Sequence, residues 1–320
     1  MRRSRLVGVV MGSIPMAACF PPVERTPPPA DAPPEILALA GAAVLIGAGD
    51  IATCPSPYDE ATAALVDSVA RADSAAGVED AIFTLGDNVY PSGAKRYFDA
   101  CWRPSWGDTS RRIMRVIRPA VGNHDLDFNL GADYYDLFGD KAGEAGRGYY
   151  SYDLGAWHVV VLNSEMMVNP AFSVDSRRAQ ENWLREDLAN NTEDCSIAMF
   201  HRPRFSSGAH AGDLRMTTLW SILYEGGVDV VLNGHEHHYE RFDPQTPLGL
   251  PDSAKGITQF IVGTGGASLT GIRTPVQPNS ARRIQGHHGV LKLTLGADEY
   301  QHAFLDTEGR VWDQGAGKCH

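Results

Sequence analysis

The segment AIFTLGDNVY occupies residues 81–90 and joins a short, β-rich apolar run to a Gly-Asp pair. The segment LIGAGD at residues 45–50 has the same arrangement, so Asp87 and Asp50 each follow an apolar run. Such runs, alternating with helical patterns, are typical of a layered α/β architecture. The carboxyl ends of strands in these sheets face the ligand crevice, so both segments predict a strand that delivers an aspartate to one site.

The rest of the chain continues this alternation and then changes to successive strands. Strands are predicted over residues 43–47, 81–85, 117–121, 157–162, 197–200 and 228–232, and helices over 59–75, 174–189 and 214–224. Further strands are predicted over 257–262, 289–295 and 300–306, with Gly-rich or polar turns between them. Residues 243–256 are rich in Pro, Gly and Asp, which predicts a surface loop.

Three later segments repeat the pattern of an apolar run that ends in polar residues able to bind metal. They are PAVGNHD at 119–125 with Asn123, His124 and Asp125, IAMFH at 197–201 with His201, and VVLNGHEHHYER at 230–241 with His235 and His237. A single Gly-Asp pair is commonly only a turn or a helix cap. Five strand ends of one kind are improbable by chance, so we expect these side chains to converge.

The residue types indicate a centre with two metal ions. Two ions about 3.5 to 4 Å apart need a bridging carboxylate to offset their repulsion, with nitrogen and oxygen ligands on either side. Carboxylate and imidazole together suit Zn, Fe and Mn, whereas Ca would take oxygen alone. His235 and His237 lie two positions apart, so in a turn each can reach a different metal.

Composition excludes several other classes of protein. The 320 residues suit one large α/β domain or two modest ones, and 43% hydrophobic with 21% charged residues is typical of a globular chain. The net charge of −11 repels nucleic acid and an anionic membrane surface alike. We therefore expect no nucleic acid polymer as a partner.

The N-terminus predicts export. Residues 1–18 contain three arginines and an apolar run, as in a signal peptide, and MAAC at 16–19 resembles the lipobox of bacterial lipoproteins. That resemblance implies cleavage before Cys19 and acylation of its thiol, which would be the chain's only membrane contact; plain secretion is the alternative. Residues 19–40 are Pro-rich and predict an extended linker, which leaves one domain at 41–320.

The five polar blocks resemble the motifs of the calcineurin-like metallophosphoesterases, and within them the purple acid phosphatases. The blocks are GDIA at 49–52, GDNVY at 86–90, GNHD at 122–125, AMFH at 198–201 and GHEH at 234–237. Tyr90, three residues after Asp87, is the feature that separates this branch from the wider superfamily. Ala52 and Ala198 depart from the family pattern, but neither position is a ligand in the family.

The resemblance implies both a fold and a ligand set. The fold is a four-layer α-β-β-α sandwich, with two mixed sheets packed face to face, flanking helices and a binuclear site at the strand C-terminal ends. Metal one, Fe(III), would be held by Asp50, Asp87, Tyr90 and His237, and metal two, which is Fe(II), Zn or Mn, by Asp87, Asn123, His201 and His235. Asp87 would bridge the ions, and tyrosinate on Fe(III) would make the protein purple.

Two histidines are candidates for work on the substrate. His124 matches the family histidine that contacts phosphate, and Asp125 is placed to hold its imidazole. His210 lies nine residues after His201, where family members carry a substrate-facing histidine, and is the candidate acid for the leaving group. Arg202 could reach a phosphate oxygen, but an arginine beside a proline is equally consistent with a surface position, so Arg202 is left outside the site. GTGGAS at 263–268 predicts a turn near the rim of the site.

The function these features predict is hydrolysis of small phosphate monoesters by a metal-bound hydroxide in an exported enzyme. A phosphodiesterase acting on nucleotides or cyclic nucleotides would use the same centre and is the nearest alternative. A non-catalytic lipoprotein that binds metal or phosphate is the alternative from another class. No oligomeric state or physiological substrate is predicted.

The five cysteines are consistent with export. If Cys19 carries lipid, four cysteines remain, and after export they lie in an oxidising compartment. Four cysteines allow three possible pairings. We favour Cys54 with Cys101, since each follows a metal-ligand loop, and Cys195 with Cys319, which would tie down the C-terminus; free thiols are the alternative.

Overall fold

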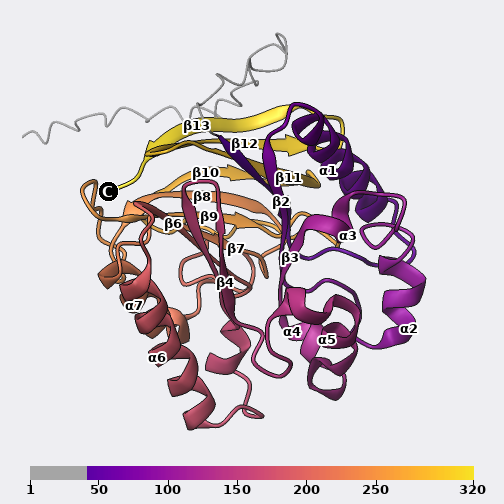
Figure 1. Cartoon of the computed structure of the whole chain (residues 1–320), viewed down its shortest axis with the longest axis horizontal. Helices are drawn as coiled ribbons and strands as arrows, with labels where there is room; N and C mark the ends of the chain where they lie inside the picture. Colours follow the sequence, from indigo (N-terminus) through magenta and orange to yellow (C-terminus); the bar gives the residue numbers. More distant parts are fainter. Residues whose placement is uncertain (1–41) are drawn as a thin grey trace, which may run out of the picture.

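The computed structural model describes residues 42–320, which form two β-sheets with helices on their outer sides (Figure 1). The predicted signal peptide at 1–18 and linker at 19–40 lie outside the described residues. The described chain is an α/β fold with two mixed sheets and flanking helices, as the sequence predicts.

The first sheet has the strand order β13-β12-β11-β1-β2-β3. Strands β1, β2 and β3 run parallel to one another, while β11 pairs with β1 in the antiparallel direction. The carboxyl ends of the three parallel strands therefore meet at one edge. The bounds are β1 Ala43–Ala48, β2 Glu79–Leu85, β3 Ile117–Ala120, β11 Gly289–Leu295, β12 Glu299–Asp306 and β13 Val311–Lys318.

The second sheet has the order β10-β8-β9-β7-β6-β5-β4. Strands β5, β6, β7 and β9 are parallel, and the sheet is closed on each side by antiparallel strands. The bounds are β4 Tyr150–Leu154, β5 Trp157–Val161, β6 Cys195–Phe200, β7 Val230–Asn233, β8 Tyr239–Gln245, β9 Ile257–Val262 and β10 Ser280–Ile284.

The long helices cover the outer faces of the two sheets. In Figure 1, α1 lies beside the first sheet, and α6 and α7 lie together against the second. Their bounds are α1 Tyr58–Ala75, α6 Val174–Asn190 and α7 Thr217–Glu225; shorter helices are α2 Lys95–Tyr97, α3 Ile113–Val116, α4 Asn123–Leu126 and α5 Ala132–Phe138. The three long helices match the three predicted ones to within a few residues.

A buried apolar core joins the inner faces of the two sheets. The rings of Tyr239 in β8 and Phe304 in β12 stack with their centres 4.3 Å apart. The indole of Trp157 in β5 donates a hydrogen bond of 2.7 Å to the carbonyl of Gly296 after β11. These contacts fix one sheet against the other, so the loops at their common edge have a rigid support.

Four strands were not predicted: β4, β8, β10 and β13. Three of them, β4, β10 and β13, are edge strands, which are exposed on one side and need no regular apolar alternation. Strand β8 reads YERFDPQ, and it extends to Gln245, so the predicted loop over 243–256 is wrong at its start. Glu240 accepts from the backbone of Ser207, and Arg241 pairs with Asp313 of β13 in the other sheet; no local pattern reveals such distant partners.

Both favoured disulfides are present, Cys54 with Cys101 and Cys195 with Cys319. The first joins the loop after β1 to the η1 turn at Phe98–Trp102, and the second ties the C-terminus to the start of β6. None of the helices within residues 42–320 is long and apolar enough to cross a membrane.

Candidate metal centre

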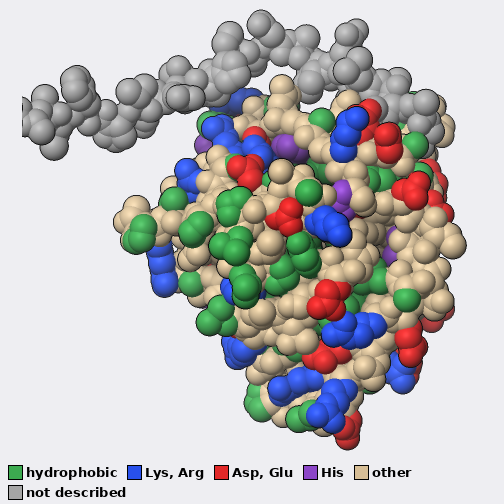
Figure 2. Space-filling model, turned by 90° about the vertical axis from the view of Figure 1, so that its left-hand side faces the viewer, with side chains coloured by type: hydrophobic (Ala, Val, Ile, Leu, Met, Phe, Trp, Pro, Cys, Tyr) green, Lys and Arg blue, Asp and Glu red, His purple; other side chains and the backbone are tan. Residues whose placement is uncertain are grey.

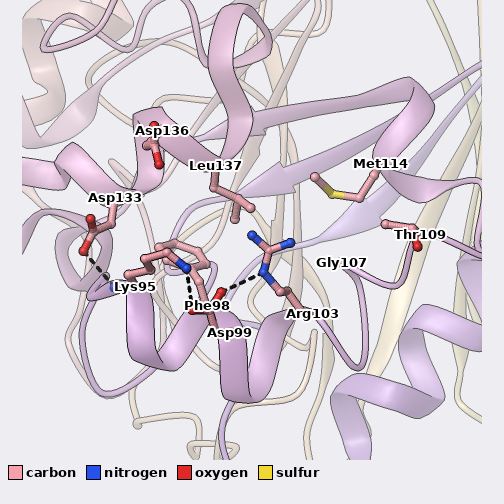
Figure 3. Close-up of a pocket in the computed structure, with 10 residues that line it drawn as sticks. All are labelled: Lys95, Phe98, Asp99, Arg103, Gly107, Thr109, Met114, Asp133, Asp136 and Leu137. Carbon is pink, nitrogen blue, oxygen red and sulfur yellow. Dashed lines mark hydrogen bonds and ion pairs between the residues drawn. The ribbon is translucent and has the colours of Figure 1, made fainter.

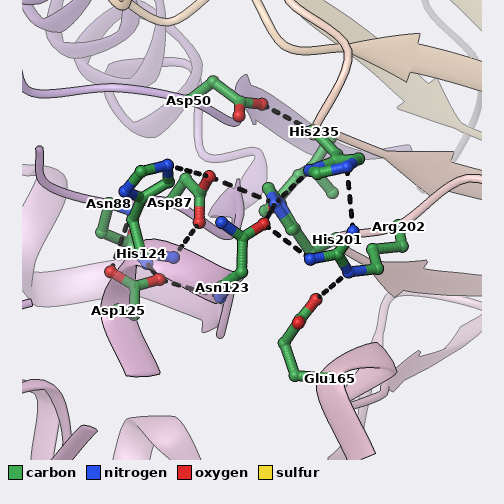
Figure 4. Close-up of polar contacts among 12 residues, drawn as sticks. Asp50, Asp87, Asn88, Asn123, His124, Asp125, Glu165, His201, Arg202 and His235 are labelled. Atoms are coloured by element: carbon green, nitrogen blue, oxygen red, sulfur yellow. Dashed lines mark hydrogen bonds and ion pairs between the residues drawn. The ribbon is translucent and has the colours of Figure 1, made fainter. Parts of the chain in front are cut away.

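Each predicted ligand follows the carboxyl end of a strand, and these ends meet between the two sheets (Figure 4). Asp50 follows β1, Asp87 follows β2, Asn123 follows β3, His201 follows β6 and His235 follows β7. The first three strands are parallel to one another, as are the last two, so the side chains converge although the chain separates them widely. The predicted convergence is confirmed.

One cluster forms around the hydroxyl of Tyr90. This oxygen lies 2.9 Å from Asp50 Oδ1, 3.1 Å from Asp87 Oδ2 and 3.2 Å from His237 Nε2. His237 Nε2 also lies 3.2 Å from Asp50 Oδ1. These are the four residues that the sequence predicts for metal one.

A second cluster forms around His201. Its Nε2 lies 3.1 Å from His235 Nδ1, 3.2 Å from Asn123 Oδ1 and 3.3 Å from Asp87 Oδ2. Asp87, His201 and His235 each offer one ligand atom, and these atoms lie within 4.8 Å of one another. Asp87 thus belongs to both clusters.

Backbone carbonyls orient two of the imidazoles. His201 Nδ1 lies 2.7 Å from the carbonyl of Leu85, and His237 Nδ1 lies 2.7 Å from the carbonyl of Ser268. A carbonyl only accepts, so Nδ1 carries a proton in both rings and Nε2 is the ring nitrogen directed at the cluster. Ser268 ends the turn at 263–268, so the prediction that this turn lies at the rim is confirmed.

The electrostatics of the clusters favour cations. Asp50 and Asp87 are fully buried. Burial opposes charge on His201, but the carboxylates of Asp87 and Asp50 outweigh it and raise the pKa of His201 to about 10. Burial likewise opposes charge on His237, and Asp50 outweighs it, so that its pKa is about 9. Protons on His201 and His237 thus offset the negative charge of Asp50 and Asp87, and bound metal cations would take over this role. Carboxylate and imidazole ligands together suit Fe, Zn or Mn.

The ligand loops have unusual backbone conformations and approach one another closely. Asp50, Asp87 and His235 have φ values of 58°, 50° and 68°, a left-handed conformation that costs free energy and often marks functional sites. At Gly122, a Cβ atom would collide with the backbone nitrogen and carboxylate of Asp87. Only glycine permits this close approach of the two loops.

The sequence of residues 44–239 matches the calcineurin-like phosphoesterase family, over more than half of the chain. The chain belongs to this family. The match runs from β1 to the start of β8 and so contains every residue of both clusters. The family predicted from the five motif blocks is confirmed.

Relatives of this phosphoesterase include acid phosphatases. Human acid phosphatase type 7 is 27% identical over 286 residues, which cover 76% of this chain and 62% of the relative. Purple acid phosphatase 18 of Arabidopsis thaliana is 32% identical over 189 residues, covering 57% of this chain and 39% of the relative. The chain thus spans less than two thirds of the length of these relatives. The purple acid phosphatase PPD1 of yellow lupin has a similar fold, with a TM-score of 0.70 and 18% identity, over 87% of this chain and 54% of the lupin chain.

His124 of the phosphoesterase lies beside the first cluster. Its ring packs against Tyr90 with centres 4.5 Å apart, and its backbone N–H donates to Asp87 Oδ1 at 2.8 Å. Its Nδ1 lies 2.7 Å from the carbonyl of Pro91, which leaves Nε2 available. About a third of the side chain is exposed, so it can meet a ligand from solvent.

The expectation that Asp125 holds the imidazole of His124 is wrong. The carboxylate of Asp125 is fully buried and accepts hydrogen bonds from the backbone of Gly122 and from Asn88. It turns back toward the start of α4, so the acid nearest the His124 ring is Asp127, at 3.5 Å. Asp125 is therefore a structural residue of the loop.

His210 lies on the other side, near the second cluster. Its ring centre is 5.1 Å from that of His235, and its Nδ1 is 3.4 Å from the buried carboxylate of Glu236. About half of the side chain is exposed. The structure thus brings His210 to the metal centre, as the sequence predicts, with one face open to solvent.

Two residues outside the predicted set complete the second cluster. Arg202 Nη2 lies 3.1 Å from Asn123 Oδ1, its Nη1 lies 3.0 Å from His235 Nε2, and its Nε donates to Glu165 at 2.7 Å (Figure 4). Neither Arg202 nor Glu165 is among the residues that the sequence predicts for the site. A signal for Glu165 existed, because it follows the predicted strand over 157–162 as the ligands follow theirs.

A separate cavity of about 210 Å³ lies between α2, η1 and α5 (Figure 3). Its two basic side chains, Lys95 and Arg103, both pair with Asp99, and the backbone of Lys95 donates to Asp133. The residues of the two metal clusters do not line it. We therefore assign it no part in the site.

Proposed function

We propose that this protein is an exported phosphoesterase that hydrolyses small phosphate monoesters at a binuclear metal centre. The observation that carries the proposal is the pair of clusters that share Asp87. A shared buried carboxylate is what two neighbouring cations require. The acid phosphatases among the relatives support the choice of a phosphate ester as substrate.

We assign the residues of the first cluster to metal one and those of the second cluster to metal two. Asp50, Tyr90 and His237 would hold metal one, Fe(III), and Asn123, His201 and His235 would hold metal two, which is Fe(II), Zn or Mn; Asp87 would bridge. Bound metals supply a nucleophile from water near neutral pH and neutralise the oxygens of the phosphoryl group. The carbonyls of Leu85 and Ser268 keep the imidazole Nε2 atoms aimed at the centre.

His124 and His210 complete the proposed chemistry. In its imidazolium form, His124 can donate from Nε2 to a phosphate oxygen while its Nδ1–H donates to the carbonyl of Pro91. His210 can deliver a proton to the leaving oxygen, because its exposed side chain stands at the edge of the second cluster. Each histidine then acts on a different part of the ester.

Export and anchoring belong to the same proposal. The two disulfides support export, since such bonds persist in oxidising compartments. A signal peptide at 1–18, lipid at Cys19 and a domain that begins near residue 41 would place the site in water on a short tether. The acidic net charge favours a small substrate over a polyanion. On the face in Figure 2, basic and acidic side chains are interspersed, so this face offers no continuous positive field.

Metal analysis and visible absorption of the purified protein, followed by a panel of phosphate esters across pH, test the proposal. We expect two metals per chain, a visible band if iron occupies metal one, and faster turnover of monoesters. A preference for diesters would assign a phosphodiesterase instead. A metal-replete sample that hydrolyses no ester would favour a metal- or phosphate-binding lipoprotein.

A further inference from the structure

Among the described residues, Arg202 is the one arginine or lysine whose side chain contacts two residues of the second cluster. Its two terminal nitrogens face Asn123 Oδ1 and His235 Nε2 at 3.1 and 3.0 Å (Figure 4). Arg202 lies outside the five motif blocks, so the family resemblance gives it no role. A guanidinium in this position needs an explanation, because the same cluster is built to attract metal.

Glu165 holds the guanidinium in place. Its carboxylate is almost fully buried, and it accepts from Arg202 Nε at 2.7 Å. A buried carboxylate needs a paired cation, so Arg202 cannot swing away without leaving Glu165 uncompensated. The backbone of Glu165 is itself fixed, since its N–H donates to the side chain of Asn163 at 3.1 Å. Glu165 therefore holds the guanidinium group of Arg202 in a fixed orientation toward the second cluster.

The contact with His235 is incompatible with a metal on the same ring. Arg202 Nη1 can only donate, so this contact requires the lone pair of His235 Nε2. A metal held at Nδ1 would leave the proton on Nε2, and two donors cannot bond each other. Arg202 Nη1 would then lose its acceptor. Asn123 Oδ1 has two lone pairs, so it can accept from Arg202 Nη2 and still face a metal.

We propose that Arg202 binds a phosphate oxygen of the substrate beside metal two and thereby favours monoesters over diesters. This inference rests on the proposed function. The N–H group that Arg202 loses from His235 needs an anionic acceptor, and a phosphoryl oxygen supplies one. Guanidinium groups bind phosphate with paired, charge-assisted hydrogen bonds.

The preference for monoesters follows from charge. A monoester presents three unesterified oxygens and up to two negative charges, whereas a diester presents two oxygens and one charge. A fixed cation in a partly buried position attracts the more highly charged group more strongly. Arg202 is thus a specificity-determining residue.

The test compares Arg202→Gln and Arg202→Lys with the wild type, all loaded with metal. Arg185→Gln is the matched control, because Arg185 also pairs with a glutamate, Glu225, but on the exposed surface. Arg202→Gln combined with Glu165→Gln removes the ion pair as a neutral unit, in case the single variant does not fold. Elemental analysis gives the metal content, and calorimetric titration with inorganic phosphate gives the affinity without any turnover.

We expect unchanged metal content and a phosphate affinity that falls about 10- to 100-fold in Arg202→Gln and in the double variant, as expected for a charged hydrogen bond. Arg202→Lys keeps part of the affinity because it keeps the charge. The specificity constant for an aryl monoester falls by a similar factor, while that for the matching aryl diester falls less than about 3-fold. Arg185→Gln matches the wild type in every measurement.

Two results would overturn the inference. One is wild-type phosphate affinity in metal-replete Arg202→Gln or the double variant. The other is tighter binding of the second metal with unchanged phosphate affinity, which would show that Arg202 competes with the metal for its ligands. Wild-type protein that binds phosphate through Arg202 but hydrolyses no ester would contradict the proposed function and the preference for monoesters, and would leave the phosphate contact of Arg202 standing.

Discussion

The carboxylate of Asp125 binds both hydrogen-bond donors of Asn88, the backbone N–H at 3.0 Å and the side-chain amide at 2.9 Å. The same carboxylate accepts from the backbone of Gly122 at 2.8 Å. Asn88 directly follows Asp87, and Gly122 directly precedes Asn123. Asp125 therefore joins the loop after β2 to the loop after β3 and sets the spacing of two proposed ligands.

Replacement of Asp125 should damage stability and metal binding together. Asp125→Ala leaves three buried donors without an acceptor, so we expect the free energy of unfolding to fall by about 2 to 5 kcal/mol and metal content to drop. Asp125→Asn keeps one acceptor oxygen and should lose less. Urea unfolding and elemental analysis measure both effects. Asp127→Ala, which changes an exposed acid near His124, is the control. Unchanged stability in Asp125→Ala with an altered pH profile would return Asp125 to a catalytic role.

Loss of His210 should depend on the leaving group. His210→Ala is expected to slow hydrolysis of an alkyl monoester about 10²- to 10⁴-fold, because an alkoxide needs a proton, and to affect p-nitrophenyl phosphate far less. Burial lowers the pKa of His210, so its acid form is depleted as pH rises and the difference from wild type should be largest on the acidic side. Steady-state kinetics with both esters across pH measure this. Equal losses for the two esters would remove the acid role.

Tyr90→Phe should remove the visible absorption of an iron-loaded sample. Burial, reinforced by Asp50, raises the pKa of Tyr90 well above its usual value, so the phenol ionises only if a cation binds its oxygen. We expect the colour to be lost while metal two stays at wild-type content. Tyr224→Phe, whose hydroxyl contacts Asp252 on the surface, is the control. An iron-loaded variant that keeps the band would show that Tyr90 is not a ligand.

The two disulfides should differ in their effect on the site. Cys54 follows Asp50 closely, and the carbonyl of Ala52 accepts from the N–H of Tyr90 at 2.8 Å, so opening the bond to Cys101 should weaken metal retention. A Cys195→Ser/Cys319→Ser protein should keep its metals and lose about 2 to 5 kcal/mol of stability. Chelator competition and urea unfolding of both double variants compare these effects. Equal metal retention would show that the first disulfide does not support the centre.

Asp59 should make stability fall as pH rises. Burial raises the pKa of its carboxyl from 3.8 to about 7. The folded state therefore binds the proton more tightly than the unfolded state, and this contribution is fully present below about pH 4 and lost as pH passes about 7. Asp59→Asn should match the wild type at pH 4 and be more stable by about 1 to 3 kcal/mol at pH 8. Urea unfolding at the two pH values tests this, and a difference independent of pH would contradict it.

The predicted ligands show how far local patterns reach. Each of Asp50, Asp87, Asn123, His201 and His235 follows an apolar strand, and a strand end is a local feature that the sequence displays directly. The layered α/β class follows from the same alternation, whereas the family and the four-layer sandwich are what the resemblance of the five motif blocks implies. The edge strands β10 and β13 were missed because partial exposure removes the apolar alternation that identifies a strand.

The direction in which a side chain points could not be predicted from these local patterns. Asp125 was placed beside His124 because they are neighbours in the chain, yet its carboxylate points at Asn88 from another loop. The sequence leaves the direction of Arg202 open between the surface and a phosphate, yet the buried Glu165, which follows β5, turns its guanidinium into the cluster. The sequence alone determined which residues follow the strand ends that form the metal centre, because each of these motifs is a local feature of the chain. Only the tertiary structure decided which partners hold them there, because hydrogen bonds between distant loops depend on how the two sheets pack.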